Sequence, residues 1–165
     1  MSLQSGLIGE LKHESALTRK LLERVPLDKG DWKPHEKSMT LGRLATHIAQ
    51  IYGWVTTILT IDDYDFLAHP YKSNTAADTA ELLGILDQEL AGATKVLESA
   101  SDDDFEKIWT VRRGEQVYFS LPKKVAIRSW GYSHLYHHRG QLSVYLRLLD
   151  VPVPGMYGPS ADERM

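Results

Sequence analysis

Two histidines near the C-terminal end of the chain, His134 and His138, are separated by four positions. In a helix this spacing places both side chains on one face, with Cβ atoms about 5–6 Å apart, so both imidazoles can reach one metal ion. The same spacing holds zinc in zincin proteases. A pair at this spacing also arises by chance in a histidine-rich stretch, where each imidazole is an ordinary hydrogen-bonded side chain. Two imidazoles that face a dry core need partners, however, and a shared cation satisfies both at once.

The helical bearing of each histidine indicates which of them face the core. On a helix over about residues 122–149, His134 and His138 lie in the middle of the apolar face, whereas Arg139 points away from it. His47 lies on the flank of the apolar face of an earlier helix, so it can meet the pair across a helical bundle. Three histidine ligands leave a divalent ion with open positions for water or substrate, which is typical of catalytic sites. The sequence therefore predicts a metal site formed by His47, His134 and His138.

Three further polar residues are candidate catalytic helpers. Gln141 lies beside the histidine pair, where it could bind a metal-bound water or a substrate carbonyl. Glu14 falls on the apolar stripe of the first helix, so its carboxylate either orients a ligand histidine or reaches solvent at the end of a bundle. His137, at the edge of the apolar face, is a hydrogen-bond donor to the site, a base at its rim or a surface residue. The other histidines are expected at the surface: His13, His35 and His69.

The elements that must position these residues are four long helices, predicted from apolar periodicity. The first ends before Pro26, and Thr40 is a plausible N-cap of the second. Between the third and fourth helices, two short apolar runs around Gly114 predict a small hairpin or an extended crossover. We therefore expect an all-α fold, a four-helix bundle, as a single domain over residues 1–165. The expected helices span about residues 3–25, 40–60, 75–101 and 122–149, and the hairpin spans residues 108–119.

The composition excludes several classes of protein. The 165 residues are 42% hydrophobic and carry a formal charge of −3, and no cluster of Lys and Arg is long enough to suggest nucleic-acid binding. No cysteine is present, which excludes disulfides and thiol nucleophiles and fits a reducing cytoplasm. No targeting or membrane segment is evident, so we expect a soluble cytoplasmic protein. Leu135 follows His134 where metalloproteases of this spacing have a glutamate base, and no Gly-rich phosphate-binding loop occurs.

Two blocks of the sequence resemble the DinB/YfiT-like family. The C-terminal block is His-Leu-Tyr-His-His-Arg-Gly-Gln-Leu at 134–142, followed by Pro-Val-Pro at 152–154. The earlier block is Trp-Lys-Pro at 32–34, followed by residues 38–49, which include His47. The resemblance covers nearly the whole chain and implies a four-helix bundle that holds a divalent ion on His47, His134 and His138. It also implies a homodimer, and a metal-dependent thiol transferase, isomerase or hydrolase.

Two classes of function follow. The first is an enzyme in which the ion acts as a Lewis acid on a small-molecule substrate, either a low-molecular-weight thiol or water. The second is a non-catalytic, metal-stabilised protein of the stress or DNA-damage response that acts through a partner. An enzyme should show an open position beside the ion, whereas the second class predicts a closed site with a fourth ligand such as Glu14. Histidine ligands suit zinc, nickel, iron and copper, and we expect zinc or nickel before iron.

Overall fold

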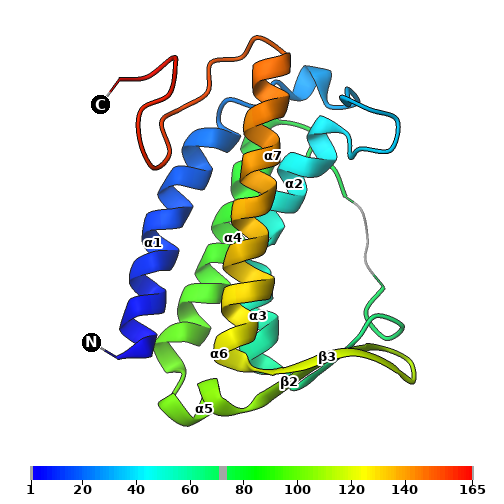
Figure 1. Cartoon of the computed structure of the whole chain (residues 1–165), viewed down its shortest axis with the longest axis vertical. Helices are drawn as coiled ribbons and strands as arrows, with labels where there is room; N and C mark the ends of the chain where they lie inside the picture. The colour runs from blue at the N-terminus through cyan, green and yellow to red at the C-terminus, as the bar shows by residue number, and fades with distance from the viewer. Residues whose placement is uncertain (1, 71–73, 165) are drawn as a thin grey trace.

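The long helices of the molecule run side by side along its longest axis (Figure 1). The structure is a computed structural model that describes residues 2–70 and 74–164. The prediction of a mostly helical bundle is confirmed. No helix in these two ranges is both long and apolar enough to cross a membrane. The helices of the bundle are α1 (Leu3–Leu22), α2 (Leu41–Gln50), α3 (Gly53–Thr60), α4 (Thr79–Ser99) and α7 (His134–Leu148).

Side-chain caps set where these helices begin. The Thr40 side chain accepts a hydrogen bond from the Arg43 backbone N–H, so the predicted N-cap is confirmed. The predicted start of the third helix near Thr75 is wrong, because α4 begins at Thr79 behind an Asp78 cap. The three residues before this cap are not helical, and the Ala76 N–H donates to a buried threonine hydroxyl on α2.

Two helices that the periodicity predicts as continuous are interrupted. The second is broken at Ile51 and Tyr52, where the backbone forms tighter i→i−3 hydrogen bonds and separates α2 from α3. The fourth consists of α6 (Lys123–Ala126), a π-helical segment (Ile127–Ser133) and α7. Two short helices lie in the connections: a 3₁₀ turn η1 (Leu27–Lys29) and α5 (Asp102–Glu106).

A small sheet lies at one end of the bundle (Figure 1). The predicted hairpin is confirmed as β2 (Ile108–Arg113) and β3 (Gln116–Pro122), which pair antiparallel. Gly114 in its turn has φ 59°, a left-handed conformation that favours glycine. A third strand, β1 (Asp63–Asp65), was not predicted and pairs parallel with β2 on its other edge. Trp109 on β2 is fully buried, so the sheet contributes to the bundle core.

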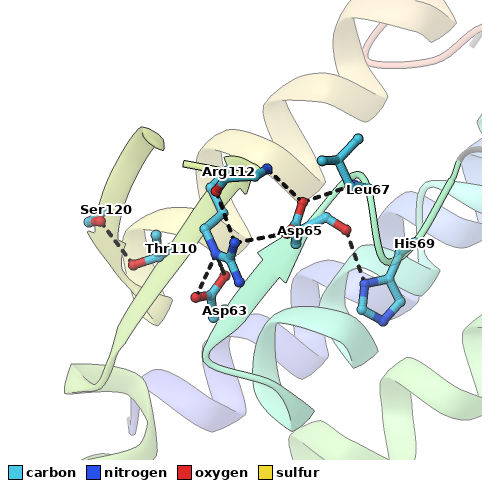
Figure 2. A network of polar contacts seen from close by, with 8 residues as sticks. Asp63, Asp65, Leu67, His69, Thr110, Arg112 and Ser120 are labelled. Atoms are coloured by element: carbon cyan, nitrogen blue, oxygen red, sulfur yellow. Dashed lines mark hydrogen bonds and ion pairs between the residues drawn. The ribbon is translucent and has the colours of Figure 1, made fainter. Parts of the chain in front are cut away.

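An ionic network fixes β1 to β2 (Figure 2). The Arg112 guanidinium donates to the carboxylates of both Asp63 and Asp65, at 2.7 and 2.8 Å. Asp65 also accepts hydrogen bonds from two backbone N–H groups in the adjoining turns. Side chains alternate along a strand, so Tyr64 between the two aspartates points to the other face. Its ring lies 5.0 Å from that of Trp54, centroid to centroid, which brings β1 against α3.

Arg139 is buried, and its predicted outward orientation is wrong. The guanidinium donates to the Glu14 carboxylate and to the hydroxyls of Thr18 and Tyr157. The physical reason is that α7 packs against α1 as well as α2. A residue that points away from the histidine face of α7 therefore enters a second interface within the bundle.

Candidate metal centre

Three histidines from two helices converge between α2 and α7. His47 comes from α2, and His134 and His138 come from the first turns of α7. Each offers one ring nitrogen, and these three atoms lie within 4.8 Å of one another. The Nε2 atoms of His47 and His134 are 3.3 Å apart. His138 is buried and the other two are half-buried, so the cluster lies at the edge of the core.

Hydrogen bonds orient the two histidines of α7. The Nδ1 atom of His134 lies 3.2 Å from the Trp130 carbonyl oxygen, and that of His138 lies 2.7 Å from Oε1 of Gln141. Both oxygens are acceptors, so each Nδ1 carries the proton and donates. Each Nε2 then keeps its lone pair for a ligand bond, which is the tautomer that metal-binding histidines adopt.

Burial keeps these imidazoles neutral. Burial, followed by the charges of the neighbouring histidines, lowers the pKa of both His47 and His134 to about 4. The pKa of His138 is also lowered, first by burial. A metal ion binds only the neutral imidazole, so the three side chains are in the ligand form at neutral pH. The donor set and its protonation fit a divalent ion, and the His47, His134 and His138 cluster could hold one.

The interruptions of the helices lie next to these ligands. The π-helical segment ends at Ser133, one residue before His134, and its Trp130 carbonyl is the acceptor for that histidine. The break between α2 and α3 follows His47 by one helical turn. Single π-helical turns inside α-helices are frequent at functional sites. Both breaks therefore lie beside the histidine cluster, and residues at or next to each break line an adjoining cavity described below.

One cavity borders the cluster at His47 and has a volume of about 290 Å³. Glu89 of α4 lines it and is a functional candidate that the sequence did not reveal, because its helix contributes no ligand. Burial raises the pKa of its carboxyl group. The described lining residues come from α2, α3, β1, the segment after β1, and α4: His47, Gln50, Gly53, Trp54, Thr57, Tyr64, Pro70 and Glu89.

A second cavity borders the cluster at His134 and has a volume of about 350 Å³. It lies against the π-helical segment and the start of α7, and among the described residues it shares no lining residue with the first cavity. The described residues that line it are Ser129, Trp130, Ser133, His134 and His137. The cluster therefore has a space beside each of two different ligands.

The three helper candidates lie in different places. Gln141 holds His138 by the hydrogen bond described above. His137 is exposed, with its ring 4.9 Å from that of His138. Glu14 is buried, but its carboxylate accepts from Arg139 and Tyr157 and not from a histidine. The structure thus gives Glu14 another set of partners. The remaining histidines are exposed, as predicted: His13, His35 and His69.

This combination, a helical bundle with three converging histidines on its second and last long segments, defines a class of candidate metalloproteins. The sequence pattern of the DinB family matches residues 2–164. The chain therefore belongs to the DinB family.

Three proteins are similar to this chain, and two of them are described as DinB-like. The uncharacterized protein YrdA of Bacillus subtilis is 26% identical over 154 residues, which cover 91% of this chain and 85% of that protein. The crystal structure of the DinB-like protein YjoA of B. subtilis superposes with a TM-score of 0.71 at 15% identity, over 97% of this chain and 99% of that one. A DinB-like protein of Bacillus cereus superposes with a TM-score of 0.68 at 21% identity, over 93% and 97% of the two chains. At these identities the solved structures establish the shared fold.

Proposed function

We propose that this protein is a metal-dependent enzyme that transfers a group between two small molecules, one of them a low-molecular-weight thiol. His47, His134 and His138 would hold the ion. The observation that carries the proposal is the pair of separate cavities, one beside His47 and one beside His134. A hydrolase needs room for one organic substrate and water, whereas a transferase needs room for two organic groups.

The ion, when bound, supplies Lewis acidity that lowers the pKa of a thiol or of water. The chain's own residues do the rest. Gln141 holds His138 in the ligand tautomer through its Nδ1 atom. Trp54 lines the first cavity and Trp130 lines the second, so each cavity offers an aromatic surface for a bound organic group. The exposed imidazole of His137 lines the second cavity, where it is placed to exchange a proton with the group bound there.

A non-catalytic role predicts a closed site with Glu14 as a fourth ligand. Two observations favour the enzyme instead. The Glu14 carboxylate is engaged by Arg139 and Tyr157. The histidine cluster also borders space on two sides. A metal that served only to stabilise the bundle would need neither cavity.

The first test is metal content. Purified wild-type protein should hold about one equivalent of a divalent ion, and the triple variant His47→Ala, His134→Ala, His138→Ala should hold none. His13→Ala removes an exposed histidine of α1 and should leave the metal content unchanged. Equal, near-zero metal in the wild type and the triple variant would contradict the metal site.

The second test is turnover. Metal-loaded protein is supplied with glutathione, bacillithiol or mycothiol and with an electrophile such as monochlorobimane. We expect one thiol to give turnover that the triple variant lacks. If none of the three thiols gives turnover, and the metal-loaded protein hydrolyses an activated ester, the transferase is replaced by a hydrolase.

A further inference from the structure

The cavity beside His47 is lined by both an acidic side chain and aromatic rings. One wall carries the carboxylate of Glu89 from α4, and another carries the rings of Trp54 and Tyr64 from α3 and β1. Among the described residues that line this cavity, none is a lysine or an arginine. The described part of the lining therefore offers one negative charge and two aromatic rings, with no lysine or arginine to match the charge.

Glu89 lines the cavity and has no hydrogen-bond or ion-pair partner within residues 2–70 and 74–164. Its side chain is half-buried, and no hydrogen bond or ion pair joins its carboxylate to any of the residues that the structure describes. A carboxylate removed from water without a partner costs free energy, and burial correspondingly raises its pKa. A structural role does not account for this cost, since an uncharged residue would pack in the same place.

Gly53 makes room for this carboxylate. A Cβ atom at position 53 would lie 2.3 Å from Oε2 of Glu89, so any larger residue there would displace the carboxylate. Gly53 is the first residue of α3, directly after the break in the second long helix. The break and the glycine together admit a charged group next to the metal cluster.

The aromatic rings complete the same chemistry. The rings of Trp54 and Tyr64 lie edge to face with centroids 5.0 Å apart. The two aspartates that flank Tyr64 on β1 are both paired with Arg112 (Figure 2). The faces of indole and phenol rings attract organic cations, most strongly where water is excluded. A cavity lined by both a carboxylate and such rings has the chemistry that binds an ammonium group.

We propose that this cavity is a subsite for a positively charged amino group on the substrate, with Glu89 as its ion-pair partner and Trp54 and Tyr64 as its aromatic wall. The proposal rests on the proposed function, because it places the ammonium group on the molecule whose thiol reaches the ion. It makes Glu89 a residue that determines substrate specificity.

The test compares two probes that differ in one charge. Cysteamine carries a thiol and an ammonium group, and N-acetylcysteamine carries the same thiol with a neutral amide. Their binding to zinc-loaded protein is measured by titration calorimetry. We expect wild-type protein to bind cysteamine about tenfold more tightly, the contribution of one hydrogen bond to a charged group. We expect Glu89→Gln to abolish this preference and Gly53→Ala, which moves the carboxylate, to reduce it.

Glu98→Gln is the matched control, because Glu98 is an exposed carboxylate on the same helix. It should leave the preference unchanged. Equal affinity of wild-type protein for the two thiols would overturn the subsite, as would a preference that survives in Glu89→Gln. Zinc content measured on every variant shows that the histidine cluster is intact.

A second measurement separates this proposal from the proposed function. If zinc-loaded protein binds neither thiol, the thiol chemistry fails, and the metal-free protein is titrated with n-propylammonium and with n-propanol. The indole N–H signal of Trp54 is followed by NMR and assigned with Trp54→Phe. A shift caused by the ammonium alone, and lost in Glu89→Gln, supports the subsite. Equal responses to the two probes overturn it.

Discussion

The two ligand histidines of α7 differ in what orients them. The acceptor for His134 is the backbone carbonyl of Trp130, which no side-chain substitution removes. The acceptor for His138 is the side chain of Gln141, one turn further along the helix. A single side-chain substitution can therefore remove the hydrogen bond that orients His138, but not the one that orients His134.

Gln141→Ala is expected to weaken zinc binding by about 10–100-fold, the usual effect of losing the hydrogen-bond partner of a ligand histidine. The free Nδ1 would then share the proton with Nε2, and the ring would turn more freely. Competition with a calibrated chelator measures the affinity. Gln88→Ala, on the exposed face of α4, is the control and should match the wild type. Unchanged affinity in Gln141→Ala would show that packing alone orients His138.

Glu89→Gln is expected to stabilise the metal-free protein at neutral pH. The folded-state pKa of Glu89 is raised by burial, so its contribution to stability is present at low pH and is lost as the pH rises through that pKa. The variant should therefore melt higher than the wild type at about pH 7 and equally at about pH 4.5. A gain of 1 kcal/mol would raise the Tm by roughly 2–4 °C. A lower Tm for the variant at neutral pH would mean that Glu89 has a structural partner.

At this scale the sequence predicted the convergence of the three histidines better than their surroundings. The convergence of His47, His134 and His138 was predictable because helical bearings place all three on or beside the apolar faces of two helices that meet in the bundle. Glu89 was not, because nothing in the α4 sequence distinguishes a carboxylate beside a cavity from one in solvent. Arg139 was misplaced for a related reason: a bearing measured from one face of α7 does not reveal a second buried face.

The two cavities lie where the helices and strands are irregular: at the break between α2 and α3, at the short strand β1 and at the π-helical segment. The long helices were predictable, since their apolar residues recur with helical period. The break at Ile51 and Tyr52 and the π-helical segment over 127–133 were not, because tertiary packing produces them and the periodicity continues through both. β1 was also missed: Asp-Tyr-Asp is only three residues long, too short for its alternation to stand out, and aspartate is uncommon in strands. Arg112 stabilises it by pairing with both aspartates.

Arg112→Met is expected to release β1 from the sheet. The substitution removes the guanidinium that joins Asp63 and Asp65, so the backbone amides of residues 63–65 should exchange hydrogen for deuterium faster. Hydrogen exchange followed by mass spectrometry measures this. Arg113→Met, at the next and exposed position of β2, is the control. Zinc affinity should be unchanged in both, because no metal ligand lies in the sheet. Unchanged exchange in Arg112→Met would mean that the ladder of β1 and β2 holds without the charge.

At the scale of the whole molecule, a buried polar network connects the two ends of the chain. The Glu14 carboxylate on α1 accepts from Arg139 on α7 and, at 2.8 Å, from the hydroxyl of Tyr157 in the C-terminal segment. Thr18 extends the network, because its hydroxyl lies 2.7 Å from that of Tyr52 at the helix break. Figure 1 shows the C-terminal segment folded back beside α1. Arg139 is also the neighbour of the ligand His138, so one helix turn serves both the metal cluster and the scaffold.

Arg139→Met should lower the free energy of unfolding by about 3–5 kcal/mol, because it leaves the Glu14 carboxylate buried without its cation. Urea unfolding of the metal-free protein measures this loss. Arg147→Met, which breaks the more exposed ion pair with Asp162, should cost at most about 1 kcal/mol.

The double variant Arg139→Met, Glu14→Leu tests how much of this loss in the free energy of unfolding comes from leaving the Glu14 carboxylate buried and unpaired. The remainder is the net contribution of the ion pair to stability. An apolar pair of similar size in a buried site is often as stable as the ion pair it replaces, so the double variant should recover most of the loss. It should also bind zinc as the wild type does, because Glu14 contacts no histidine. Loss of zinc with recovered stability would instead mean that the ion pair sets the rotation of α7, and hence the convergence of His134 and His138 on His47.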